Sequence, residues 1–531
     1  MPYGQSVNRR LLAGALALSA VFSAGCAKRQ DVYRVQFENS CSADVQATFA
    51  QALTLLHSFE YPEASKLFGK AVARDPSCAI ARWGAAMTLW HPLWAPPSPA
   101  ELEEGARLLA ETRGLKMTPR EAAYIDALGV FFASADPATH GARARAYEDK
   151  MNRVYRAYLD DPEATLFYAL SLLATADPRD KTYAQQFKAA ALINWVGDAH
   201  PAHPGVLHYT IHAFDYPGLA HLALPAALAY AKAAPDSAHA QHMPSHIFTR
   251  LGMCEQTIAS SRDSIRSAAE YTERAGLAGQ YDEGLHSMDY LMYALLQTAR
   301  DDEAAQLLDA LGDIEKTNVD NFKVAFTYAS SPARYALERR QWKEAKELPL
   351  APATFPWNDF PWAQSINNFA RGIGAARSGD LDAARRELAT LQDLKGKLSD
   401  ATPPYWREEV QVQIDEVRSW ILLGEGKTGE ALEAALAAAE REDAVDKHPV
   451  TPGEVLPARE LYADMLREEG LNAEALQQYE LVMQGSPNRL NALLGAAYAA
   501  KGAGEAAVAD DYFERARIQA KDGDRNRAGL Y

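Results

Sequence analysis

The feature that most constrains this chain is a recurring spacing of alanine, aromatic and proline residues. The segment "EASKLFGKAVARDP" carries this spacing at offsets 0, 4, 7 and 12, with Ala64, Phe68, Ala71 and Pro76. The segment "AEALQQYELVMQGSP" repeats it with Ala475, Tyr479, Val482 and Pro487. Small alanines let helices approach closely, an aromatic fills the gap between them, and proline ends the second helix. Because apolar residues recur at helical spacing nearly everywhere, we expect an almost entirely α-helical chain.

The spacing resembles the tetratricopeptide repeat, which has two antiparallel helices in about 34 residues. In "GEAAVADDYFERARI", Ala509 follows Ala475 by one such repeat length. The resemblance implies an all-α solenoid of helix-turn-helix repeats. A proline-rich stretch at 349–362 reads as a long loop that divides the repeats. The two predicted arrays span residues 40–348 and 363–523.

Longer phrases such as "LLHSFEYPEASKLF" and "HMPSHIFTRLG" resemble a subgroup of bacterial tetratricopeptide proteins that are exported or lipid-anchored. This resemblance implies a fold and not a reaction. Tetratricopeptide arrays are usually binding modules, so it favours a ligand- or protein-binding scaffold over an enzyme.

The N-terminus predicts export. Residues 1–25 combine a basic start with the 12-residue apolar stretch "LLAGALALSAVF", which is typical of a signal peptide. The following "SAGC" resembles a bacterial lipobox, with Cys26 as the lipidated first residue of a periplasm-facing lipoprotein. An ordinary signal peptide and an uncleaved anchor are the alternatives.

Composition limits the partners. A net charge of −16 and a pI near 5.4 argue against nucleic acid as a main partner, and we expect membrane contact only through the lipid anchor. With 48 % apolar residues, the chain can bury a large core. A protein, a peptide, a small ligand or a metal ion remains compatible with this surface.

The other three cysteines predict one disulfide. Cys41 and Cys78 each precede the first helix of consecutive repeats, so we expect them to pair, which leaves Cys254 unpaired.

Histidines are concentrated in one region. Of 13 in the chain, eight lie between residues 200 and 250. Shifting His208 and His212 by one repeat length places them on His242 and His246. Each pair is spaced i, i+4, so its two rings lie on one face of a helix.

The next repeat places two further polar residues on the equivalent stripe, His286 and Asp289. The full candidate metal set is His208, His212, His242, His246, His286 and Asp289. Imidazole ligands favour zinc, copper or nickel. The alternatives are general acid–base chemistry in a metal-dependent enzyme, polar recognition of an organic or peptide ligand, and structural packing. We expect His57 to be structural, and His200 and His203 to lie in loops.

A concave groove is the second candidate site. The register assigns to it Trp83, Trp90, His91, His239, Arg250 and Tyr293. No P-loop, GxSxG or HExxH motif occurs in the sequence, so whether the chain is an enzyme stays open. The leading hypothesis is an exported binding scaffold. The alternatives are a metal-binding protein or metal-dependent enzyme, and a structural adaptor in an envelope complex.

Overall fold

The computed structural model describes residues 33–93, 96–235, 237–399, 402–445, 448, 450–525 and 527. Among them it contains 24 α-helices, three short 3-10 helices and no strand. The residues from Tyr33 onward form one unit. The prediction of an all-α fold is confirmed. The signal peptide and Cys26 lie outside the described residues.

The helices of the first half are α1 (Gln46–His57), α2 (Tyr61–Arg74), α3 (Ala79–Met87), α4 (Pro99–Ala110), α5 (Pro119–Gly129), η1 (Phe131–Ala133), η2 (Pro137–Thr139), α6 (His140–Ala157), α7 (Pro162–Thr175), α8 (Ala184–Ala199), α9 (Pro204–Phe214), α10 (Ala220–Ala233), α11 (Ala238–Arg250) and α12 (Cys254–Ala275). The remaining helices are α13 (Asp282–Gln297), α14 (Asp301–Gly312), α15 (Phe322–Glu338), α16 (Trp342–Lys346), η3 (Trp357–Asp359), α17 (Pro361–Arg377), α18 (Leu381–Gly396), α19 (Pro404–Gly424), α20 (Thr428–Asp443), α21 (Ala458–Glu468), α22 (Asn472–Gly485), α23 (Leu490–Ala503) and α24 (Ala506–Gln519).

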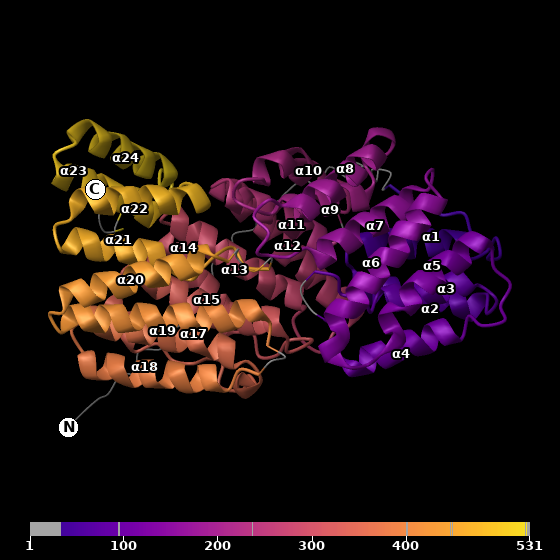
Figure 1. The fold of residues 1–531 in the computed structure, drawn as a ribbon, viewed down its shortest axis with the longest axis horizontal. Coiled ribbons are helices and arrows are strands. Elements are labelled where there is room, and N and C mark those ends of the chain that lie inside the picture. Colours follow the sequence, from indigo (N-terminus) through magenta and orange to yellow (C-terminus); the bar gives the residue numbers. More distant parts are fainter. Residues whose placement is uncertain are drawn as a thin grey trace, which may run out of the picture. The chain divides into compact units, whose positions relative to one another are not determined.

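Consecutive helices pack as hairpins, and the first helix of one hairpin also contacts the first helix of the next (Figure 1). Contacts of this second kind join α7 to α9, α9 to α11, α11 to α13 and α13 to α15. This is the pattern of a tetratricopeptide-like solenoid. It brings the stripes of successive first helices side by side, which is the arrangement that the histidine register requires.

The repeat spacing acts through close helix contact. Phe68 of α2 lies against Gly84 of α3, where an added Cβ would come within 2.3 Å of the ring. Tyr479 of α22 lies against Gly495 of α23 in the same way. A small residue opposite an aromatic ring therefore sets the distance between these helices.

The proline-rich loop at 349–362 does not separate the helices on its two sides. It contains the short helix η3, and α15 before the loop packs directly on α17 after it. The C-terminal helices also return to the middle of the chain, because α23 contacts α13 and the Leu490 amide donates to Gln297 Oε1 at 2.9 Å.

None of the described helices combines the length and the apolar character that crossing a membrane requires.

Candidate metal centre

Six buried histidines meet where three first helices run side by side. They are His208 and His212 of α9, His239, His242 and His246 of α11, and His286 of α13. Each is less than one-tenth exposed. The two histidine pairs that lie one repeat length apart in the sequence are carried by the neighbouring helices α9 and α11.

The first triad consists of His208, His212 and His239. The Nε2 atom of His208 lies 3.0 Å from Nε2 of His212 and 3.2 Å from Nε2 of His239. All three rings offer a ligand atom within 4.8 Å of one another. Three imidazole nitrogens converging in this way can hold one metal ion at the usual distance of about 2.0–2.1 Å from each.

The second triad consists of His242, His246 and His286. The Nε2 atoms of His242 and His246 lie 3.0 Å apart, and the ring centroids of His242 and His286 lie 4.1 Å apart. Here too the ligand atoms lie within 4.8 Å of one another. The ring of His286, which is 5 % exposed, brings one nitrogen to this group.

The outward nitrogens of four of these rings are held by acceptors. His208 Nδ1 donates to the His57 carbonyl at 2.7 Å, His246 Nδ1 to Asp215 at 2.9 Å, and His239 Nδ1 to Glu283 at 3.2 Å. Asp215 also binds Arg250, and Glu283 also binds Lys323, so both carboxylates are ionised and can only accept.

The fourth outward nitrogen is fixed through serines. Ser264 donates to the Ala238 carbonyl and accepts from Ser287, so the hydroxyl proton of Ser287 is already used. Ser287 can therefore only accept from His242 Nδ1, which lies 3.2 Å away and 3.4 Å from the Ser245 hydroxyl. This is the arrangement in which metal-binding histidines are usually oriented.

These outward bonds fix the tautomers, and the tautomers leave the inward nitrogens without protons. A neutral imidazole carries one N–H, and the accepting partners place it on Nδ1 in His208, His239 and His246. In His242 it lies on Nδ1 when the ring donates to Ser287, although the Ser245 hydroxyl also lies 3.4 Å from this nitrogen. The Nε2 lone pairs of these rings then face one another at 3.0 Å in one triad and 3.2 Å in the other. A cation at the centre of each triad, either an extra proton that makes one ring an imidazolium or a metal ion, would remove the repulsion between these lone pairs.

A third cluster of titratable groups provides the contrast. His57 Nε2 donates to Glu163 at 2.6 Å while its Nδ1 accepts from the Tyr209 hydroxyl at 2.8 Å. His203 Nε2 donates to the same carboxylate at 2.9 Å, and its Nδ1 accepts from the Gly205 amide. Every ring nitrogen here has a partner of the opposite kind. The cluster is a satisfied hydrogen-bond network, and it supports the first triad by presenting the His57 carbonyl to His208.

Burial keeps the inward rings unprotonated. Desolvation and the neighbouring histidines hold the pKa of His208, His242 and His286 well below the ordinary value. Neutral imidazoles are the form that binds metal.

Two residues lie in other places than the register assigned to them. Asp289, placed in the ligand set, accepts from Ser330 at 2.7 Å and lies 3.6 Å from Arg334, outside both triads. His239, assigned to a groove, belongs to the first triad. Sequence reasoning also missed Asp215 and Glu283, although Asp215 follows His212 by three residues and Glu283 precedes His286 by three. This spacing could have marked both acids as lying near the histidines, but not their partners, because Asp215 binds His246 and Glu283 binds His239 on the neighbouring helix.

Two aromatic side chains cover the triads. Phe59, whose backbone is left-handed at φ 55°, stacks on His212 and meets His208 edge-on at 4.3 Å. Tyr290 stacks on His246, with ring centroids 4.8 Å apart, and lies edge-on to His242 at 4.7 Å. A non-glycine residue in the left-handed region is strained and is commonly retained at functional sites.

The residues predicted to line a groove divide into two sets. Trp83 and Trp90 are buried in the core, where Trp83 packs on Tyr124 and Trp90 on Tyr147. They fill space between helices and do not line a groove. His91 is half-buried beside Tyr61.

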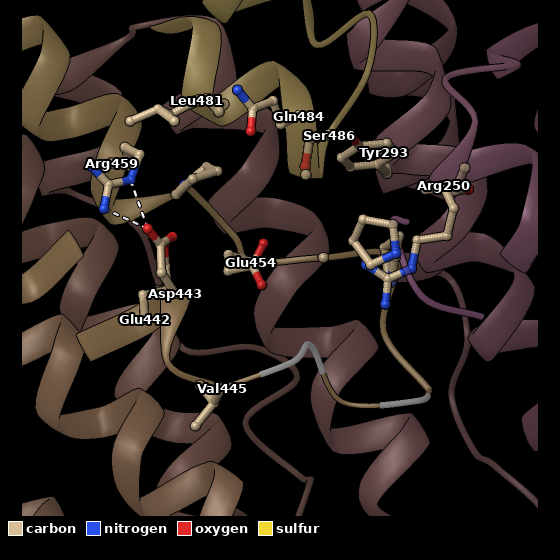
Figure 2. A pocket seen from close by; sticks show the side chains of 17 residues that line it. Arg250, Tyr293, Glu442, Asp443, Val445, Glu454, Arg459, Leu481, Gln484 and Ser486 are labelled. Carbon is tan, nitrogen blue, oxygen red and sulfur yellow. Dashed lines mark hydrogen bonds and ion pairs between the residues drawn. The ribbon is translucent and has the colours of Figure 1, made fainter. Parts of the chain in front are cut away.

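Arg250 and Tyr293 instead line a cavity of about 280 Å³. Figure 2 shows both on one side of this cavity, Glu454 between, and the paired Arg459 and Asp443 opposite. Since Arg250 also binds Asp215, which holds His246, one side chain connects the cavity to the second triad.

Cys41 and Cys78 are joined in a disulfide with a Cα–Cα distance of 4.8 Å, and Cys254 is a buried free thiol. The disulfide uses both thiols, so these cysteines and Asp75 are not a metal site.

Comparisons with known proteins find only distant likenesses. No protein-family model and no curated protein matches the chain. Among solved structures, a human IFIT1 dimer with m7Gppp-AAAA is similar over 91 % of this chain and 96 % of that chain, at 13 % identity and a TM-score of 0.38. The P58(IPK) TPR domain is similar over 87 % of this chain and 99 % of that chain, at 12 % identity and a TM-score of 0.21. Likenesses this distant carry no conclusion about ligands.

Proposed function

We propose that this tetratricopeptide-like protein binds metal ions at the two histidine triads. The observation that supports the proposal most strongly is the pair of Nε2–Nε2 contacts at 3.0 and 3.2 Å between nitrogens that carry no proton when the rings are neutral. A single ion in each triad would satisfy all three inward nitrogens at once. In the network of His57, Glu163 and His203, by contrast, every ring nitrogen has a complementary partner.

The ligand set selects the class of ion. Both triads offer only imidazole nitrogen, which suits zinc, copper and nickel better than calcium or magnesium. The carboxylates and the carbonyl that hold the outward nitrogens raise ligand basicity and fix the ring orientation.

The test is calorimetric titration of the purified protein with zinc and with copper, together with elemental analysis of the bound metal. We expect binding tighter than about micromolar. The double variant His242→Ala/His246→Ala should lose the second site and keep its helical circular dichroism. His221→Ala is the matched control, because this histidine is exposed on α10. Wild-type protein that binds neither metal tighter than micromolar would contradict the proposal.

We propose further that the protein acts at the bacterial cell envelope, anchored by lipid on Cys26. The support is the sequence of residues 1–26, with its basic start, apolar stretch and lipobox-like "SAGC". Several acyl chains hold a protein firmly on a membrane, whereas one holds it weakly. Cys26→Ser should therefore move the protein from the membrane fraction to the soluble periplasmic fraction, and unchanged fractionation would reject the anchor.

A further inference from the structure

We infer that the two triads form one dinuclear centre of the copper class, in which the two ions interact directly. This inference rests on the proposed function, because it requires that each triad holds an ion. It adds that the two ions are neighbours and that one helix supplies ligands to both. It also adds that the surroundings favour copper.

Helix α11 contributes histidines to both triads. His239, His242 and His246 follow one another at spacings of three and four residues, so they form one stripe on this helix. His239 completes the first triad with α9, while His242 and His246 complete the second with α13. Any shift of α11 would therefore change both metal sites together.

The rings of the two triads approach each other almost as closely as the most widely spaced pair of rings within one triad. The ring centroids of His212 and His246 lie 6.4 Å apart, and so do those of His239 and His242. Within the second triad, the rings of His246 and His286 are already 6.1 Å apart. Two ions, each about 2.0–2.1 Å from its ligand nitrogens, would therefore be neighbours within one continuous group of buried rings.

The charges around the centre favour copper. The two carboxylates that hydrogen-bond the triads are each also bound to a cation, Asp215 to Arg250 and Glu283 to Lys323. Lys323 also binds Asp282, so three carboxylates face two cations, which leaves little negative charge to offset two divalent ions in a buried site. An ion that can be monovalent, or a divalent pair that shares a bridging hydroxide, reduces this cost. Among the imidazole-binding metals, copper has a stable monovalent state, and as a divalent ion it binds nitrogen ligands most tightly.

The test is electron paramagnetic resonance of the full-length protein loaded with two equivalents of copper(II) sulfate. We expect a spectrum that is strongly broadened or reduced in intensity by coupling between the ions. Acid unfolding under argon should restore the full signal, which separates coupling from reduction to copper(I). His286→Ala and, independently, His212→Ala should each convert the spectrum to that of an isolated ion. His221→Ala should leave the coupled spectrum unchanged.

The outcomes distinguish this inference from the proposed function. Two bound ions with additive, uncoupled signals would overturn the dinuclear centre and leave metal binding in place. A single bound ion per chain would do the same. No copper or zinc binding to the wild-type protein would reject both. If one histidine variant fails to fold, the variant of the other triad still provides the isolated-ion reference.

Discussion

His208 Nε2 has one lone pair, and two other imidazole nitrogens lie within 3.2 Å of it. One lone pair can accept only one proton donor, so neutral rings alone cannot satisfy both contacts. A metal ion at the centre of the triad can, because it accepts an electron pair from each ring. This count of protons distinguishes the triads from the many buried histidines that serve only in packing.

Asp215 offers the sharpest test at the level of one residue. It accepts from His246 Nδ1 and from Arg250, at 2.9 and 3.0 Å. Asp215→Asn keeps the shape but turns an amide N–H toward one of these donors. We expect affinity at the second triad to fall by about 10- to 100-fold, while the first triad is unaffected.

Stepwise zinc titration in competition with a chelator measures both affinities. Asp263→Asn is the control, because Asp263 forms an exposed ion pair with Arg266 on α12. Unchanged affinity in the Asp215 variant would show that this carboxylate does not orient a metal ligand.

The sequence predicted five of the six histidines as one set, because a step of one repeat length preserves their helical phase. It did not predict that His239 joins the triad while Asp289 turns to Arg334 and Ser330. Helical phase indicates which face a residue occupies. Which neighbours it meets depends on how far apart the helices lie, and a repeat pattern does not contain that distance.

At the scale of helices, the repeat spacing places a small residue opposite an aromatic ring, so that neighbouring helices pack closely. The ring of Phe68 in α2 occupies the space that a side chain on Gly84 of α3 would need. Gly84→Ala should destabilise the fold by about 1–3 kcal/mol, because the added methyl would displace a ring that is itself packed on Phe49.

Gly69→Ala is the matched control for this substitution. Gly69 also lies within α2, and nothing comes within 4 Å of an added Cβ. There the change should stabilise the protein by about 0.5–1 kcal/mol, because alanine favours helix. Urea unfolding measures both, and a Gly84 variant as stable as wild type would contradict the packing rule.

Hairpins that keep the alanine–aromatic–proline spacing were predictable, whereas the stretch from α4 to α8 was not. Helix lengths there vary from 11 to 18 residues, and two 3-10 helices interrupt the order, so no fixed period survives. The loop at 349–362 indicated a boundary, yet α15 and α17 pack together across it. The composition of a loop indicates how flexible the connection is. It does not indicate whether the helices on its two sides are in contact.

At the scale of the whole molecule, buried charge links distant segments. Arg334 of α15 donates to the carbonyls of Gly453 and Glu454, 119 and 120 residues later in the chain. Near this contact, Glu409 of α19 is half-buried, and burial followed by the charge of Glu454 raises its pKa to about 8. The native state therefore holds a proton that the unfolded chain releases above its ordinary pKa near 4.5.

The raised pKa of Glu409 predicts in which direction stability changes with pH. The native state binds more protons than the unfolded state between pH 4.5 and about 8, so Glu409 lowers stability progressively as the pH rises through this window. Glu409→Gln removes the effect and should stabilise the protein at pH 7.5 by roughly 1–3 kcal/mol, and by clearly less at pH 5.5. Chemical unfolding of both proteins at the two pH values measures the difference. A variant whose advantage is equal at both pH values would contradict a raised pKa.

The most direct measurement of the central claim is anomalous X-ray diffraction from crystals grown with copper or zinc. We expect two anomalous peaks, one about 2.0–2.2 Å from the Nε2 atoms of His208, His212 and His239, the other at the same distance from those of His242, His246 and His286. The outward nitrogens should keep their bonds to the His57 carbonyl, Asp215, Glu283 and Ser287. Metal-loaded crystals with no peak at either triad, or with peaks only at exposed side chains, would contradict the account.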